Sequence, residues 1–176
     1  RLLAFKKIQE DLRAKDATPE QRRDLEEKRR LMTRAEQREQ QQRLLELRGW
    51  WLERMAKGPR PFQEKLTLFW HGHFATSATK VREAYYMWRQ NETFRTLGSG
   101  NWLQFLYAVA KDPAMLIWLD QAQSRKQHPN ENFARESMEL FTLGEGHYTE
   151  KDVTEAARAM TGWTLNRADQ HYVYRE

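Results

Sequence analysis

The feature that most constrains the fold is residues 19–57, a long stretch with helical character and very little apolar surface. It opens with Thr18-Pro19-Glu20, a typical helix start with a threonine N-cap, proline at the first helical position and an acid in the first turn. Acids then precede bases by four positions, an orientation that stabilises a helix by ~0.2–0.5 kcal/mol per pair. These pairs are Asp24–Lys28, Glu26–Arg30 and Glu39–Arg43. The pattern predicts one long helix that ends at Gly58-Pro59.

The first part of this helix lacks the apolar stripe that would bury it against a core. Few residues between 25 and 44 are apolar, and a heptad repeat begun at Leu25 fails at Glu39. We therefore predict a solvated helical arm, either single or folded as a hairpin. From Leu44 onward the apolar spacing becomes that of a packed helix.

Charges and aromatic residues divide the chain near the same place. Residues 1–60 hold 17 Lys and Arg against 11 Asp and Glu, a net charge of +6, whereas residues 61–176 hold 13 against 14. Of 21 aromatic residues, only Phe5 precedes Trp50. We therefore expect residues 1–43 to form a charged helical arm and residues 44–176 a helical core domain.

The composition excludes several classes of site. The chain has no cysteine, so this segment can hold no disulfide and no thiolate metal centre. No run approaches the roughly 20 apolar residues of a membrane helix, so no transmembrane segment is expected. The chain opens at Arg1 without a signal-peptide pattern, and we expect a fragment that is truncated at its C-terminus.

Apolar spacing after residue 58 is helical almost throughout and predicts an all-α, irregular multi-helix bundle. Strand-like alternation is found only in residues 171–176. Two helical faces are expected to be buried: Phe62, Leu66, Phe69 and His73, and Val81, Ala84, Tyr85 and Trp88. Expected helix caps are Asn101, Asp112, Asn130, and Thr149 together with Asp152.

Three stretches carry a family resemblance: PFQEKLTLFWHGHFATS at 61–77, HPNENFARESMELFTLGEGHYTEKDV at 128–153 and EAARAMTGW at 155–163. They resemble the signature blocks of the bacterial family catalogued as domain of unknown function 1800. The resemblance covers about residues 44–163 and leaves residues 1–43 outside it, as an insertion. Ser137 and His147 depart from the residues usual in the family.

The resemblance implies a bacterial protein of uncharacterised reaction. Members of this family are often exported, which implies a periplasmic or extracellular location, and are commonly encoded beside another uncharacterised exported protein. The family pattern also continues beyond residue 176 with a further block that contains "HD". A site built from both halves would therefore be only half visible in this chain.

The polar segment 130–143 is the first candidate site. On a helix, Glu136 and Glu139 share a stripe opposite Phe133. This stripe is either a face open to solvent or one wall of a cleft. In a cleft the two carboxylates would repel each other, so that one pKa would rise and an acid/base pair would result. The expected substrate-binding groups beside them are Asn130, Glu131, Asn132 and Arg135.

The WHGH segment is the second candidate, and three interpretations remain open. If the helix continues through Gly72, His73 lies on the apolar face and His71 lies above Thr67, where a buried hydrogen bond is the usual fate of a histidine. If Gly72 breaks the helix, the two imidazoles converge and, with a carboxylate from 130–143, supply a metal site. The third interpretation is acid/base use of His71 without a metal.

Two further patterns have simpler explanations. Residues 143–153 are rich in glycine and acids but lack the alternating oxygen ligands of an EF-hand, and they are typical of a connection between two helices. The basic arm contains many acids and no nucleic-acid-binding motif, which favours a protein partner over a nucleic acid.

Two functions are therefore expected. The first is a hydrolase-like acid/base enzyme, without a cofactor, that acts on a cell-envelope or extracellular polymer through Glu136, Glu139 and His71. The second is a non-catalytic scaffold that binds a protein partner, encoded nearby, through the helical arm.

Overall fold

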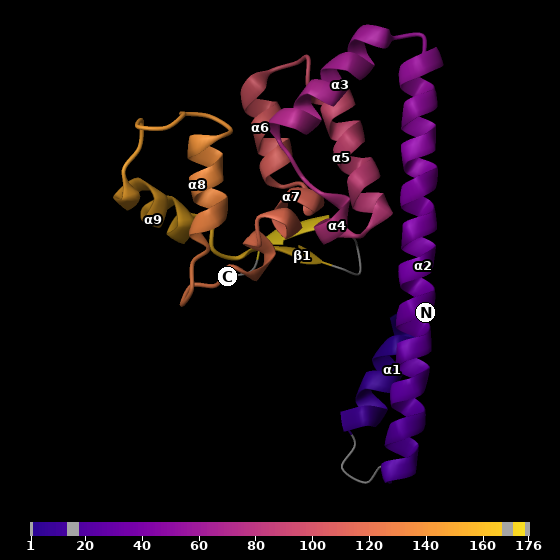
Figure 1. The fold of residues 1–176 in the computed structure, drawn as a ribbon. Helices are drawn as coiled ribbons and strands as arrows, with labels where there is room; N and C mark the ends of the chain where they lie inside the picture. The colour runs from indigo at the N-terminus through magenta and orange to yellow at the C-terminus, as the bar shows by residue number, and fades with distance from the viewer. Residues whose placement is uncertain (1, 14–17, 167–170, 175–176) are drawn as a thin grey trace. The chain divides into compact units, whose positions relative to one another are not determined.

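A computed structural model describes residues 2–13, 18–166 and 171–174 (Figure 1). The chain forms two compact units, Arg1–Glu46 and Leu47–Glu176. The division at residues 43 and 44 that the sequence suggests stays a prediction. The long helix α2, Pro19–Lys57, has the bounds that the sequence predicts.

The first unit contains α1, Leu2–Arg13, and the first part of α2. Thr18 begins α2, since its Oγ1 accepts a hydrogen bond from Gln21 N at 3.2 Å while Gln21 Oε1 accepts one from Thr18 N at 2.9 Å. No residue of α2 is buried. The expected ion pairs Asp24–Lys28, at 2.6 Å, and Glu39–Arg43, at 2.5 Å, lie along its surface. The helix is therefore supported mainly by its own side chains.

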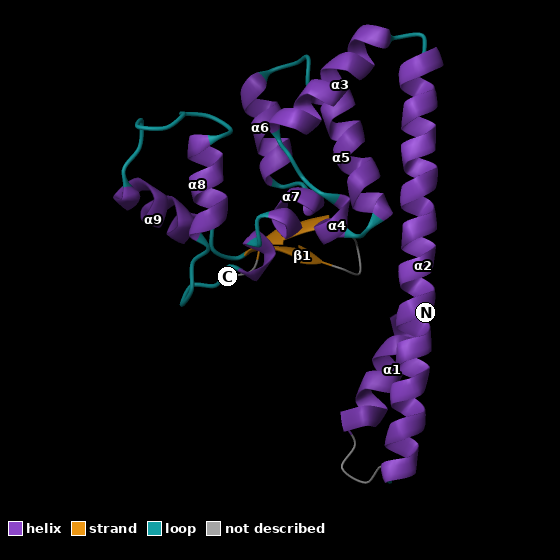
Figure 2. Ribbon diagram, in the orientation of Figure 1, coloured by secondary structure: helices purple, strands orange, loops and turns teal. Residues whose placement is uncertain are grey.

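The second unit is mostly helical, which confirms the predicted fold class (Figure 2). A short antiparallel hairpin near the end of the chain is its one sheet among the described residues, and Trp163 pairs with Tyr174 in it. The unit's elements after α2 are α3 Pro61–His73, α4 Ala78–Val81, α5 Ala84–Leu97, α6 Trp102–Ala110, α7 Pro113–Trp118, the 3₁₀ turn Gln121–Gln123, α8 Glu131–Glu139, α9 Glu150–Ala159, β1 Trp163–Asn166 and β2 His171–Tyr174.

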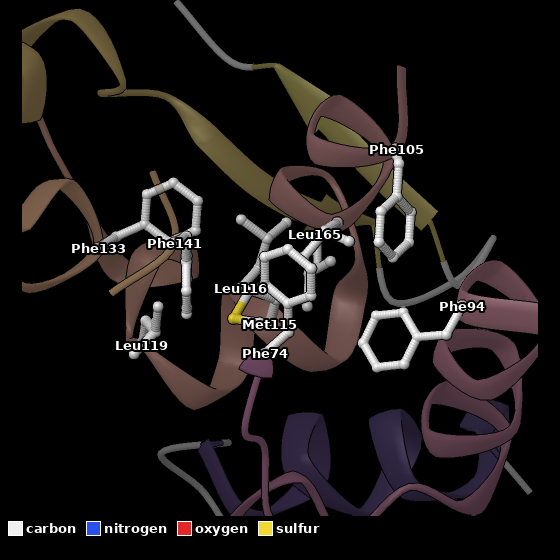
Figure 3. Packing of buried hydrophobic residues seen from close by; sticks show 10 residues of the cluster. Phe74, Phe94, Phe105, Met115, Leu116, Leu119, Phe133, Phe141 and Leu165 are labelled. Carbon is white, nitrogen blue, oxygen red and sulfur yellow. The ribbon is translucent and has the colours of Figure 1, made fainter. Parts of the chain in front are cut away.

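The core of this unit lies where α5, α6 and α7 meet (Figure 3). Phe74, directly after α3, is fully buried, and its ring lies 5.5 Å from that of Phe105 and 5.0 Å from that of Phe141. Met115 and Leu116 of α7 are also fully buried. This contact between Phe74 and Phe141 joins the segment after α3 to the segment after α8.

The predicted helix caps are confirmed. Asn101 Oδ1 accepts from Gln104 N, Asp112 Oδ1 from Met115 N and Asn130 Oδ1 from Asn132 N. Thr149 and Asp152 form a complete capping box at the start of α9. Helix α8 ends at Glu139, within the candidate segment 130–143.

The predicted buried face of α3 is only partly correct: Leu66 and His73 are half-buried, but the two phenylalanines are not. Phe62 and Phe69 are 75% and 59% exposed, whereas Glu64 and Thr67, on the opposite face, are buried. Apolar spacing predicts the inward face only when the polar face has no partners inside the protein. Here Glu64 is compensated by the buried Arg95 and by Arg54, so the polar face of α3 lies against the rest of the unit.

The second predicted face is half correct. Val81 and Ala84 are buried as expected, but Tyr85 and Trp88 are 42% and 41% exposed. The buried side of α5 instead carries polar side chains, of which Arg95 is only 4% exposed. Again hydrogen-bonded polar groups occupy positions that a pattern of apolar residues cannot indicate.

Candidate functional site

The helices α8 and α9 pack against each other and hold most of the first candidate site (Figure 1). Arg135 donates two hydrogen bonds of 2.7 Å to the carboxylate of Glu150, at the start of α9. The nearer acid in the sequence, Glu131, lies 3.9 Å from Arg135 and accepts a hydrogen bond from Thr154 at 3.2 Å. Arg135 and Glu131 therefore join the two helices.

Glu139 has a partner in the connection between these helices. The Tyr148 hydroxyl donates a short hydrogen bond to Glu139 Oε2, and this bond raises the pKa of Tyr148. The hydrogen bonds from Arg135 lower the pKa of Glu150. Tyr148 therefore stays protonated and Glu150 stays ionised, which suits a fixed cluster of ion pairs and hydrogen bonds.

Asn130 and Asn132 differ in their use. Asn130 caps α8, and its Nδ2 also donates to Leu119 O at 2.7 Å, so its side chain is fully engaged in the fold. Asn132 is exposed on the first turn of α8. Only the second of these asparagines leaves its amide open to an external molecule.

Glu136 is half-buried on α8. Within the described ranges, no hydrogen bond or ion pair engages its carboxylate. It is therefore the carboxylate of this segment with the most freedom to meet a ligand.

The second candidate site belongs to a buried polar network between α2, α3 and α5. The Glu64 carboxylate accepts hydrogen bonds from Arg95 Nε at 2.9 Å, Arg54 Nε at 2.5 Å and Trp51 Nε1 at 3.1 Å. Arg95 also donates to Asn91 Oδ1, and Asn91 Nδ2 lies 3.1 Å from His71 Nε2. His71 is thus one end of a chain of hydrogen bonds that leads to Glu64.

This network shifts two pKa values. Burial opposes the charged form of Glu64, but hydrogen bonds from Arg95 and Arg54 outweigh it and lower the pKa of Glu64 to about 2. Burial, with the nearby charge of Arg95, lowers the pKa of His71 to about 4. Glu64 is therefore an anion and His71 a neutral imidazole near neutral pH.

His73 lies in a different environment from His71. Helix α3 continues through Gly72, and the His73 ring packs 5.7 Å from Trp70 and 6.2 Å from Phe141. Its Nε2 is buried without a hydrogen-bond partner. The break at Gly72 that would let the two imidazoles converge is absent from this described helix.

The two candidate sites have separate sets of partners. His71 contacts Asn91, Trp51 and Phe94, and no interaction of the described residues links it to Glu136 or Glu139. No cluster of three or more metal-binding side chains occurs within the described ranges. None of the helices described there is long and apolar enough to cross a membrane.

Sequence patterns did not indicate that the buried residues Arg95 and Asn91 would take part in a polar network. One signal pointed toward the network: Glu64, Thr67 and His71 recur on one helical face. The partners of that face come from α5, so local spacing could not reveal them.

The fold and both polar clusters define a mostly α-helical protein with a buried Glu64–Arg95 ion pair. The chain matches the family described as protein of unknown function (DUF1800) over residues 3–176, and it belongs to that family. The match is longer than the expected 44–163 and includes the helical arm, which corrects the expectation that the arm lies outside the family pattern. No curated protein and no solved structure matches the chain.

Proposed function

We propose that this chain is a bacterial, exported partner-binding protein, in which the helical arm, residues 1–43, binds a protein encoded nearby. The main support is that α2, although 39 residues long, has no buried residue. A helix without a buried face is stabilised by its own ion pairs or by a partner. The family resemblance supports export and a partner of this origin.

A shallow groove on α2 is the surface that we assign to this partner. Its volume is about 350 Å³. Leu31, 58% exposed, supplies its apolar group. Three arginines and two glutamates surround this leucine, which favours a segment with an apolar residue and flanking carboxylates. The groove is lined by Arg23, Glu26, Glu27, Arg30, Leu31 and Arg34.

Co-expression with the neighbouring gene product tests the proposal. Arg30→Ala combined with Arg34→Ala is expected to remove co-purification of the partner. The matched control, Arg29→Ala combined with Arg38→Ala, removes the same charge from α2 outside the groove and should retain the partner. Equal retention by both double variants, or no co-purification with the unaltered chain, overturns the proposal.

Glu136 favours a second candidate function, acid/base hydrolysis of a cell-envelope polymer. A half-buried carboxylate without an internal partner can accept a proton from a bound substrate, and Glu139 and His71 would be its companions in this proposal. Release of soluble fragments from purified peptidoglycan measures such an activity. Glu136→Gln should abolish release, and Glu155→Gln, at a surface carboxylate of α9, should preserve it. Absence of release by the unaltered chain, or equal release by the Glu136→Gln variant, rejects this candidate.

A further inference from the structure

Among the described residues outside the candidate sites, Asp112 is the most deeply buried carboxyl group. It lies between α6 and α7 and is 3% exposed. Oδ1 accepts hydrogen bonds from Gln90 Nε2 at 2.9 Å and from Met115 N at 3.1 Å. Oδ2 is buried and has no hydrogen-bond partner in the part of the chain described. A charged oxygen in this position is far more costly than a neutral one.

The groups around Asp112 extend across three segments. Gln90 belongs to α5 and is fully buried, and its Oε1 accepts a hydrogen bond of 2.5 Å from Thr76, in the turn before α4. Helix α7 carries no ionisable side chain, and the charge of Arg89 on α5 favours the anion. The other neighbouring cations are Lys111, which packs over Tyr107 and Tyr172, and Lys80 of α4, which is paired with Asp120.

We propose that Asp112, Gln90 and Thr76 form a proton-operated switch at the junction of α5, α7 and the turn before α4, in which protonation of Asp112 reverses the direction of both hydrogen bonds and stabilises the fold. In the anion, Gln90 Nε2 donates to Oδ1. In the acid, the Oδ1 hydroxyl donates to Gln90 Oε1, and the carboxamide, turned by half a rotation, donates through Nε2 to Thr76 Oγ1. The two contacts are kept with reversed direction, and Oδ2 becomes an uncharged carbonyl oxygen.

The electrostatics agree with this geometry. Burial raises the pKa of Asp112 to about 7, against the opposing effects of the Met115 N–H, the Arg89 charge and the Gln90 amide. Because the folded pKa is above the ordinary value of 3.8, the folded chain binds more protons than the unfolded chain between about pH 4 and pH 7. The contribution of Asp112 to stability is therefore complete below pH 4 and is lost as the pH rises through 7.

The buried His71 imidazole changes the stability of the fold over an overlapping pH range, and its effect has the opposite sign. Its folded pKa of about 4 lies below the ordinary 6.5, so its contribution is lost as the pH falls from about 6.5 to 4. The two effects offset each other in the unaltered chain. The informative quantity is therefore the difference between the unaltered chain and an Asp112→Asn variant at each pH.

Urea unfolding from pH 4 to pH 8.5 tests the switch. Asparagine keeps the cap and one oxygen acceptor but has no titrating proton. Relative to this variant, the unfolding constant of the unaltered chain should rise by up to tenfold per pH unit between about pH 4 and 7, then level off. The control, Asp152→Asn, removes an exposed capping carboxylate whose pKa is lowered by hydrogen bonds from Thr149. The ratio of the unfolding constants of the unaltered chain and this variant should therefore stay constant above pH 5. A constant difference for Asp112→Asn overturns the proposal.

A second measurement applies even if the variant does not fold. Carboxyl carbon NMR of the unaltered chain, labelled at aspartate, should show one resonance that titrates near pH 7. Seven aspartates with ordinary acidic titrations would contradict the switch.

Discussion

Arg95 holds Glu64 in a bidentate ion pair inside the second unit, with Nε 2.9 Å from Oε1 and Nη2 3.0 Å from Oε2. Both side chains are 3% exposed. The pair joins α3 to α5, and Arg54 and Trp51 extend it to the end of α2. Because both charges are desolvated, loss of one partner leaves an incompletely compensated charge inside the protein.

We expect Arg95→Met to lower the free energy of unfolding by about 3–5 kcal/mol, the usual effect of breaking a buried pair. Urea unfolding measures the loss. Arg158→Met is the matched control, because Arg158 pairs with Glu155 at the surface, where about 0–1 kcal/mol is typical. Similar losses in both variants would show that the Glu64–Arg95 pair is not desolvated in solution.

The same pair predicts a loss of stability in acid. The pKa of Glu64 is about 2 in the folded chain and ordinarily 4.5, so its contribution is complete above pH 4.5 and is lost as the pH falls toward 2. The stability difference between the unaltered chain and Glu64→Gln should therefore shrink by about 3 kcal/mol over this range. Unfolding curves at pH 2, 3, 4 and 5 check this, and a difference independent of pH would refute it.

Two phenylalanines near the end of α3 test which face of the helix lies inward. Phe74→Ala should cost about 3–5 kcal/mol, because the ring is fully buried among other aromatic rings. Phe69→Ala, at 59% exposure, should cost about 1 kcal/mol or less. Urea midpoints of the two variants give the comparison. A larger loss of stability in Phe69→Ala than in Phe74→Ala would support the inward face that the sequence predicts.

Two glycines give opposite predictions for the same substitution. A Cβ at Gly49, within α2, meets nothing within 4 Å, so Gly49→Ala should stabilise the chain by about 0.5–1 kcal/mol. A Cβ at Gly98 would lie within 2.5 Å of the Trp70 indole and of a backbone oxygen, so Gly98→Ala should destabilise it. Thermal unfolding measures both shifts, and shifts of the same sign would contradict the packing at Trp70.

Local signals predicted the helices well. The residues that start and end α2, Thr18 with Pro19 and Gly58, adjoin the helix in the sequence. The bounds of α2 can therefore be predicted without tertiary information. Strand β1 was missed because its four residues, Trp163–Asn166, are at the lower limit of the roughly 4–8 residues over which alternation signals a strand. The alternation in its partner, residues 171–174, was visible and indicated a strand.

The polar contacts could not be predicted in the same way. Arg135 makes its close contact with Glu150, on another helix, and not with Glu131 one turn away. Glu64 lies opposite the predicted apolar face of α3, and a carboxylate is rarely buried without a partner. Its partner, Arg95, is 31 residues away in the sequence. Such pairings depend on which helices meet, and hydrophobic spacing predicts that poorly.

Isothermal titration calorimetry of the purified chain with its neighbouring gene product tests the central claim, that α2 presents a partner-binding groove, most directly. The account predicts binding that weakens at least tenfold in the Arg30→Ala, Arg34→Ala variant and is unchanged in the Arg29→Ala, Arg38→Ala variant. No heat of binding, or equal affinity for all three proteins, would contradict it.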